Sequence, residues 1–527
     1  MTQRNLTYLA TALWLLLSAC SNEIRVGGED GDAPAVAILS YLQVSLRCPP
    51  ASTESGSRAN PAAGETGNGS ETGSDNESRI DNFLLFFYRA EQRSNAPAGT
   101  TVDKILYFDR TTSEKDTAAL IAVDLPEGEY DLLVAANTGD LRPSLRGKTL
   151  GDIRDRLLTS AWTDDKGICS RFVMTSDGHT PDRVTLCGNP ADNPAKATVE
   201  VERLAARIDF RTTQAAYRIT DPDYGTATVT LLGGAILNKM QAGSYFLKRV
   251  APAGADGRLA PAAPVEYLGD EQPADGNGPQ QNYVVDPWSL SKPDDADNAA
   301  ALYDNYYTSF GTTPAGWEKI PVTAPAADGW QTLGYTMENT VSREHQTRAY
   351  CTTVVFRARY TPQGFTEGQT FYVCNGKLYA SRKEAAEEGA AYRMPVHEYP
   401  GGICYYTRRV RHANDGDDTR QGIMEYAVVR NNIYRLNISG IYRLGGEVPF
   451  PAPDPEPTPP DDPEPDPGPD PGPDPDPDPG PDPGPDPGPD PGPGPDPGPD
   501  PDPGNDGIKI ETSVETWTKK DGDDIYL

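Results

Sequence analysis

The sequence predicts an all-β protein with more than one domain. Short apolar runs alternate with turn residues, which is typical of strands in β-sandwiches. Tyr (26) greatly outnumbers Phe (12) and Trp (6), and Gly (51) and Pro (52) are abundant, as in extracellular β proteins with many turns. A length of 527 residues suggests two domains with additional segments.

The N-terminal residues predict export as a lipoprotein. Arg4 precedes a mostly apolar run, residues 8–17, which is too short to span a bilayer stably. The run ends in Leu-Ser-Ala-Cys, similar to a bacterial lipobox in which Cys20 receives the lipid. The alternative is an ordinary signal peptide with an incidental cysteine. Either way, export is expected, and lipidation would place the precursor in the outer membrane of a Gram-negative bacterium.

An isolated strand is predicted over residues 35–46, where Val36, Ile38, Leu42, Val44 and Leu46 share one parity. Residues 48–79 follow and are rich in Ser, Gly, Asn, Glu and Thr, which indicates a flexible loop.

The predicted folded body begins near residue 80. Strands are expected over 83–88, 105–108, 119–123, 130–136, 197–210, 227–237, 330–337, 349–360, 370–373, 425–429 and 433–444. Apolar residues on one face predict a helix over 150–158. A second helix is expected over 382–391, with Ser381 and Glu384 forming a capping box.

A second isolated strand, residues 508–518, lies near the C-terminus. Ile508, Ile510 and Val514 share one parity, and Lys509 and Glu511 lie on the other. A single strand needs a neighbour for its backbone groups, so this one must pair with its own body or with another copy. The preceding residues are almost entirely Pro, Asp, Gly and Glu, and they cannot build a sheet around it.

The charge of the chain disfavours nucleic acid as a partner. Residues 449–506 hold 17 acidic side chains and no Lys or Arg; removing these from the net charge of −31 leaves −14 for the rest. No basic stripe is available to neutralise phosphates.

No catalytic or metal site is predicted, and no cofactor is expected. The four histidines lie in no triad or metal-ligand pattern, and the seven cysteines include no CxxC pair. Two disulfides are possible in an exported protein, Cys169 with Cys187 and Cys374 with Cys404; buried or unpaired thiols are the equal alternative.

Several stretches taken together resemble the fimbrillins of the Bacteroidota, the subunits of type V pili, and among them the minor-fimbrillin type that forms the shaft. They are LLVAANTG (132–139), ERLAARI (202–208), YVVDPW (283–288), YTMENT (335–340), VRNNIY (429–434) and the final strand with Trp517. The resemblance covers most of the mature chain. It implies two tandem transthyretin-like β-sandwich domains.

The resemblance also implies an assembly mechanism. An Arg-specific surface protease removes the first strand, and the C-terminal strand of a neighbouring subunit fills the groove. Donor-strand residues would include Ile508, Ile510, Val514 and Trp517. The bond between Arg58 and Ala59 best resembles the processing point, with Arg47 as the main alternative and Arg79 as a third.

The expected organisation is a signal peptide (1–19), a propeptide with the first strand (20–58), an N-terminal β-sandwich (59–196), a C-terminal β-sandwich (197–446), a spacer (447–507) and a donor strand (508–527). Expected partners are other copies in a fibre on the cell surface, anchor and tip subunits, the protease, and host or bacterial surface receptors. The alternative function is a lipid-anchored basal or tip adhesin, or a monomeric surface lipoprotein that binds glycans or host proteins. The spacer is longer than the C-terminal strand needs to reach a neighbouring subunit. The position of this subunit in the fibre, in the shaft, at the base or at the tip, is therefore left open.

Overall fold

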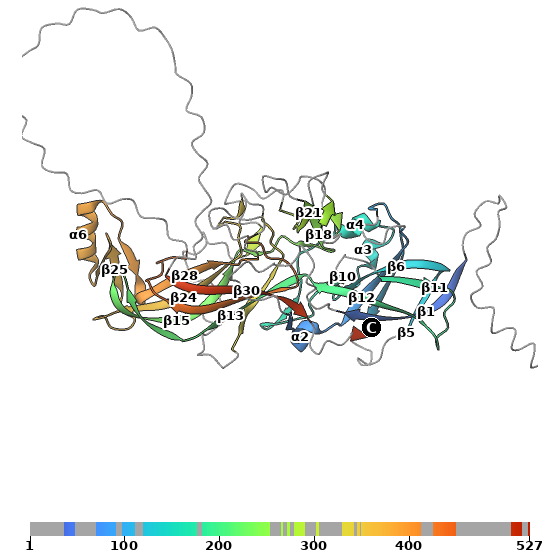
Figure 1. Cartoon of the computed structure of the whole chain (residues 1–527), viewed down its shortest axis with the longest axis horizontal. Coiled ribbons are helices and arrows are strands. Elements are labelled where there is room, and N and C mark those ends of the chain that lie inside the picture. The colour runs from blue at the N-terminus through green and yellow to red at the C-terminus, as the bar shows by residue number, and fades with distance from the viewer. Residues whose placement is uncertain are drawn as a thin grey trace, which may run out of the picture.

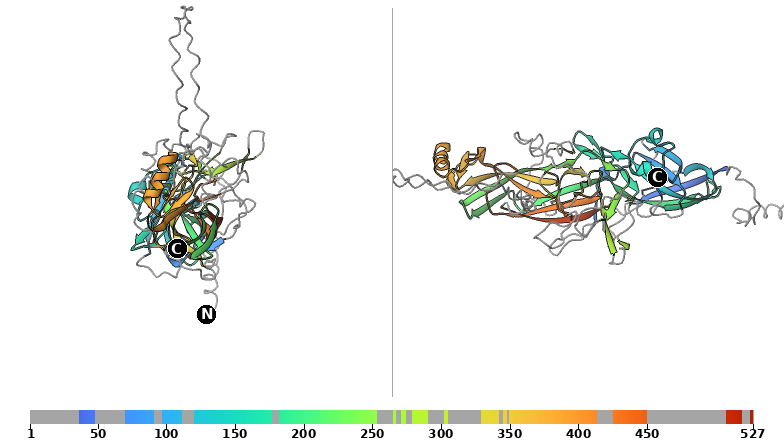
Figure 2. Two further views of the ribbon diagram at one scale, coloured as in Figure 1. Left: turned by 90° about the vertical axis from the view of Figure 1, so that its left-hand side faces the viewer. Right: turned by 90° about the horizontal axis from the view of Figure 1, so that it is seen from above.

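The computed structural model describes residues 36–47, 70–90, 97–110, 120–176, 182–252, 265–266, 271–273, 279–289, 302–304, 329–341, 345–347, 349–412, 425–449, 507–518 and 525–526. Its main strands form two β bodies arranged end to end in an elongated molecule (Figure 1). Figure 2 shows this arrangement from one end and from above. The prediction of an all-β fold is confirmed.

The first body is a nine-stranded sheet. Its order is β31-β1-β12-β10-β6-β3-β4, with β11 beside β6 and β5 beside β1. These strands are β1 (Ala37–Arg47), β3 (Asn82–Tyr88), β4 (Val102–Asp109), β5 (Leu120–Pro126), β6 (Gly128–Ala136), β10 (Met174–Ser176), β11 (Asp182–Leu186), β12 (Ala195–Arg203) and β31 (Ile525–Tyr526). The helices α3 (Arg142–Leu145) and α4 (Leu150–Arg154) pack through Leu145 and Leu150 against Leu84 and Phe86 of β3.

The second body packs two sheets against each other. One has the order β2-β30-β29-β13-β23 and the other β14-β15-β24-β28. These strands are β2 (Ser70–Thr72), β13 (Ala205–Thr212), β14 (Ala216–Asp221), β15 (Gly225–Leu237), β23 (Gln331–Met337), β24 (Thr353–Pro362), β28 (Ile403–Arg409), β29 (Asn432–Ile441) and β30 (Ile508–Thr518). Phe210 of one sheet meets Phe356 of the other, with ring centroids 5.6 Å apart, in the core between them.

Smaller elements complete the fold. A three-stranded sheet of β25 (Phe371–Cys374), β26 (Lys377–Tyr379) and β27 (His397–Tyr399) carries helix α6 (Arg382–Tyr392) at the far end of the second body (Figure 1). The remaining short elements are α2 (Asp75–Ser78), β7 (Leu157–Leu158), β8 (Thr163–Asp165), β9 (Ile168–Ser170), β16 (Lys239–Met240), β17 (Ser244–Tyr245), β18 (Arg249–Pro252), β19 (Val265–Glu266), β20 (Glu271–Pro273), β21 (Pro279–Val284), β22 (Tyr303–Asp304) and the 3₁₀ turn η4 (Pro400–Gly402).

The junction of the two bodies lies at Leu204. The single strand expected over 197–210 is two strands, because β12 pairs in the first body and β13 in the second. Leu204 connects them and is fully buried in a core cluster that includes residues of both bodies. The chain therefore crosses between the bodies inside this continuous apolar cluster.

Four further local predictions are wrong. The last part of the loop expected over 48–79 has secondary structure, because residues 70–72 form β2 and residues 75–78 form α2. The helix expected over 150–158 ends at Arg154, because residues 157–158 instead form β7 and pair with β17. Residues 425–429 are not a strand; only Val428 forms an isolated bridge, to Asn339. Ser381 precedes α6 without a side-chain capping bond, whereas a capping box does form at α4, between Thr149 and Asp152.

Candidate site of strand exchange

Strand β1 lies inside the first body with a partner along each edge. Residues 42–47 pair in parallel with β12 on one edge. Residues 37–43 pair antiparallel with β5 on the other edge, where residues 45–46 pair with β31. The strand predicted as isolated in sequence is therefore an interior strand of the sheet, and its removal would leave a slot between β5 and β12.

The side chains of β1 explain its position in the sheet. Leu42, Val44 and Leu46 are fully buried in the core of the first body. Their common parity points them to one face of the sheet, as the alternation in the sequence predicts. The start of the predicted strand differs, because Val36 and Ile38, which share this parity, are 79% and 38% exposed.

Strand β30 has the predicted bounds and alternation, but its inward side chains are less completely buried than those of β1. It pairs antiparallel with β29 over residues 508–516. Among the described strands, its other edge meets only β2, which pairs in parallel with residues 516–518. Ile508 and Val514 face the core with 2% and 8% of their surface exposed, whereas Lys509 and Glu511 are exposed. The other edge of residues 508–515 has no strand partner among the described residues.

The C-terminal segment contacts both ends of the stretch that holds Arg58, the preferred cleavage site. β31 pairs with Ser45 and Leu46, just before that stretch, and β30 pairs with Ser70–Thr72 of β2, just after it. The sequence did not reveal β2 and β31, because segments of two or three residues show no periodicity. Their positions place the end of the chain beside both flanks of residues 48–69.

Helix α2 fixes β2 to the body through a buried ion pair. The Arg207 guanidinium donates to both carboxylate oxygens of Glu77 at 3.1 and 3.2 Å, and the Tyr335 hydroxyl donates to Glu77 at 2.7 Å. Burial raises the pKa of the Glu77 carboxyl, but the Arg207 charge and the hydrogen bonds it accepts from Ser74 N–H, Tyr335 and Arg207 outweigh burial and hold that pKa below its usual value. Glu77 is therefore charged at neutral pH and anchors the segment that begins with β2.

The predicted processing and lipidation residues differ in how far the structure describes them. Cys20, Arg58 and Ala59 lie outside the described residues. Arg47 ends β1, where its backbone pairs with Glu200 of β12. Arg79 follows α2; its side chain donates to Asp81 at 2.7 Å and its carbonyl accepts from Asn137.

The donor-strand residues predicted from the sequence lie together in β30. Ile508, Ile510 and Val514 pack with the core of the second body, and Ile510 is the less buried member. Trp517 pairs through its backbone register with Glu71 of β2.

No group of three or more His, Cys, Asp or Glu side chains among the described residues is placed to hold a metal ion. No helix in the described part of the chain is long and apolar enough to cross a membrane. Neither candidate disulfide is formed, and the described cysteines are thiols; burial raises the pKa of the Cys404 thiol to about 12.

Residues 397–523 match the family model described as "Major fimbrial subunit protein type IV, Fimbrillin, C-terminal". This part of the chain is a fimbrillin C-terminal region. The match covers the strands from β27 to β30, so the fimbrillin region includes β30 and its partner β29. By its description, the matching family is one of fimbrial subunit proteins. No curated protein matches the chain.

Solved structures similar to this chain share low sequence identity with it. A protein assigned to cell adhesion from Parabacteroides distasonis ATCC 8503 shares 14% identity over 91% of this chain and 100% of that one, with a TM-score of 0.39. A fimbrilin from Porphyromonas gingivalis W83 shares 14% identity over 91% and 98%, with a TM-score of 0.37. The tip fimbrial protein of Porphyromonas gingivalis shares 11% identity over 76% and 95%, with a TM-score of 0.32.

Landmark residues of the fimbrillin resemblance pair with each other at the junction of the bodies. The Arg203 N–H donates to Asn431 at 3.2 Å, and Arg430 forms a fully buried ion pair with Glu338 at 2.9 Å. The Thr340 N–H donates to Asp286 at 2.7 Å. These stretches, far apart in the sequence, are therefore joined in pairs by buried polar contacts.

Proposed function

We propose that this chain is a subunit of a bacterial surface fimbria that supports adhesion and polymerises by strand exchange. It is exported as a lipoprotein through Cys20 and cut by an Arg-specific protease, which removes β1. The β30 segment of a neighbouring copy then enters the vacated slot between β5 and β12. Anchor and tip subunits and a surface receptor are the further partners of such a fibre.

The observation that carries this proposal is the interior position of β1. Three of its side chains, Leu42, Val44 and Leu46, are fully buried, which corresponds to roughly 5–9 kcal/mol of gross apolar stabilisation at 1.5–3 kcal/mol each. Loss of the strand would expose this core and leave the facing backbone groups of β5 and β12 without partners. A first body without β1 therefore needs a replacement strand.

Strand β30 supports the proposal as the replacement. It is an eleven-residue strand, as β1 is, and alternates apolar and polar side chains with the same period. It lies next to the edge of its sheet, where less pairing must be broken for it to leave than for an interior strand. A segment that adds to another subunit in this way makes a head-to-tail contact that does not close, which gives a filament.

The processing point is best supported at Arg58, followed by Ala59. A protease binds chain that is exposed and not engaged in secondary structure. The backbone of Arg47 pairs in the sheet, and that of Arg79 is held by α2 and by Asn137. The sequence around Arg58, residues 48–57 and 59–69, consists mostly of small or polar residues, a composition typical of sites that proteases cut.

The test is reconstitution of assembly from purified precursor. Cleavage with an Arg-specific protease should give filaments visible by electron microscopy, and sequencing of the new N-terminus should begin at Ala59. Arg58→Ala should remain uncut or be cut at Arg47, and deletion of residues 508–527 should give cut protein without filaments. Val514→Asp should block assembly, whereas the matched outward change Ser513→Asp should not. Filaments from the deletion variant would contradict the donor role of β30.

One observation favours a second function, a lipid-anchored basal or tip adhesin or a monomeric surface lipoprotein. Strand β30 is already accommodated by β29 of its own body, so the chain does not require a neighbour to satisfy that strand. In this case the surface protein would keep its lipid and sediment as a monomer. The mass of the N-terminal peptide from purified surface protein separates the two functions.

A further inference from the structure

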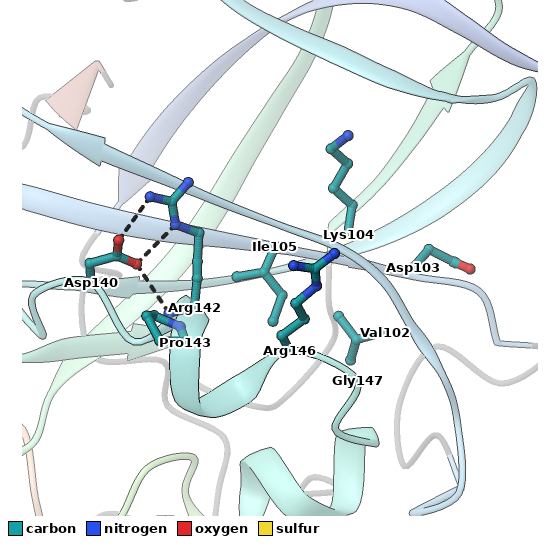
Figure 3. A pocket seen from close by; sticks show the side chains of 9 residues that line it. All are labelled: Val102, Asp103, Lys104, Ile105, Asp140, Arg142, Pro143, Arg146 and Gly147. Atoms are coloured by element: carbon teal, nitrogen blue, oxygen red, sulfur yellow. Dashed lines mark hydrogen bonds and ion pairs between the residues drawn. The ribbon is translucent and has the colours of Figure 1, made fainter.

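A groove lies beside the outer edge of β4, at the end of the first sheet far from β1. It has a volume of about 650 Å³ and is lined by Val102, Asp103, Lys104, Ile105, Asp140, Arg142, Pro143, Arg146 and Gly147. Strand β4 forms one side and the turn that contains α3 forms the other (Figure 3). In the sheet order, β4 is terminal and pairs only with β3 among the described strands.

The backbone of β4 offers hydrogen-bonding groups toward this groove. The Arg110 N–H donates to Asp81 on the β3 side at 2.7 Å. Successive residues of an antiparallel strand alternate between its two edges, so Leu106 and Phe108 also face β3. The N–H and C=O groups of Ile105 and Tyr107 therefore face outward, toward the edge where another strand can add.

The charges of the groove favour an acidic ligand at one position. The Arg142 guanidinium is held by Asp140 at 2.8 and 2.9 Å, and the Lys104 ammonium pairs with Asp124 of β5. Arg146 is exposed and has no carboxylate partner among the described residues (Figure 3). It therefore offers a cation next to the open edge.

The same strand disfavours pairing with a second copy of itself. Antiparallel pairing of two β4 strands centred on Leu106 would place Asp103 of one copy opposite Asp109 of the other. Like charges directly opposite each other across strands are destabilising. Charged residues of this kind are a known means by which edge strands avoid self-association. The occupant that fits is thus a different segment.

We propose that this groove binds an extended, proline-free segment of a partner protein as an added strand on β4, with an acidic side chain of that segment paired with Arg146. The backbone of β4 supplies the affinity that is independent of sequence, and Arg146 selects for charge. The proposed site is separate from the slot of β1, because four strands lie between β1 and β4 in the sheet order. The two sites are linked by one contact, between Lys104 of β4 and Asp124 of β5.

The probes are three fluorescent eight-residue peptides that alternate Thr and Val. The first carries Glu at its centre, the second Lys, and the third Glu with a proline beside it. Fluorescence anisotropy with the full chain should show the Glu peptide binding about tenfold more tightly than the Lys peptide. The proline peptide should not bind, because it lacks a backbone donor.

Two variants complete the test. Arg146→Glu should reverse the preference of the chain for the Glu and Lys peptides. Lys383→Glu, a charge reversal at an exposed position on α6, should leave the preference unchanged. Equal affinity for the Glu and Lys peptides, unchanged binding of the proline peptide, or no binding of any peptide at roughly 1 mM would overturn the proposal. Binding of sialyllactose, lost in Arg146→Glu, without binding of the Glu peptide would also overturn it and would identify an acidic glycan site.

Discussion

Strands β1 and β30 have nearly the same pattern in the sequence but different environments in the fold. β1 has strands on both edges and three fully buried side chains. β30 has one long partner, β29, along residues 508–516 and a three-residue partner, β2, at its end. Its side chains keep 2% and 8% exposure at Ile508 and Val514. Period-2 alternation specifies which face of a strand is buried, and it does not specify how deeply. The proposed exchange therefore requires β1 to stay in its sheet until the chain is cut, and β30 to leave its own sheet more readily than β1 does.

The largest expected effect is a difference in stability cost between the same substitution at Val44 of β1 and at Val514 of β30, both of which face a core. Val44→Asp should lower the free energy of unfolding by about 4 kcal/mol or more, because a carboxylate is buried there without a partner. Val514→Asp should cost only about 2 kcal/mol, because the side chain can turn toward the open edge. Urea unfolding of the uncut protein measures both, with Gln43→Asp as the control on the other face of β1. Equal costs at the two valines would break the comparison.

The next largest effect on stability is expected from weakening the attachment of β2 to the second body. Glu77→Gln should lower the free energy of unfolding by about 3 kcal/mol, because Arg207 loses one of its buried charge partners. The loss should be accompanied by faster hydrogen exchange in residues 516–518, which β2 covers. Asp75→Asn, a change in the exposed first turn of the same helix, is the control and should have little effect on either measurement. Unchanged exchange in 516–518 would show that β2 does not stabilise the end of β30.

Acid should weaken the body that holds β30. His412 is fully buried next to the Tyr434 hydroxyl of β29, at 2.9 Å, and burial lowers the pKa of its imidazole to about 4. The unfolded chain binds this proton near pH 6.5, so stability is complete above that pH and falls as the pH decreases toward 4. The expected loss is on the order of 3 kcal/mol.

Thermal unfolding between pH 7 and 4 measures this loss. His412→Gln should make the stability depend less on pH over this range. Glu77 has a folded pKa below its usual value, so its contribution is present above its unfolded pKa and is lost at lower pH than that of His412. An unchanged pH dependence in His412→Gln would assign the acid sensitivity to other groups.

The smallest effect is expected on the outward face of β30. Glu511 accepts a hydrogen bond from Asn437 of β29 at 3.0 Å, and both side chains are at the surface. Glu511→Ala should change the free energy of unfolding by at most about 0.5 kcal/mol, because exposed polar pairs contribute little. Chemical denaturation against Val514→Ala, an inward change in the same strand, provides the comparison. A cost as large as that of Val514→Ala would mean that the outward face holds β30.

The sequence predicted the bounds and buried faces of β1 and β30, because alternation over eleven residues is a strong signal. It could not predict their neighbours, since the pairing of β1 with β5 and β12 depends on segments about 80 and 155 residues away. Short elements such as β2, β7 and β31 exist only through tertiary pairing. Tertiary pairing also explains why the helix expected over 150–158 ends early, because residues 157–158 pair with β17. The ion pair of Glu77 with Arg207 was also missed, because nothing in the local sequence relates the two residues.

Hydrogen exchange of the uncut, full-length protein tests the central claim most directly. Amide protection reports the free energy needed to open each strand locally. We expect residues 42–46 of β1 to exchange only through global unfolding, and residues 508–515 of β30 to exchange at least tenfold faster through local opening. Equal protection of the two strands, or faster exchange in β1 than in β30, would contradict the account of a retained first strand and a mobile last one.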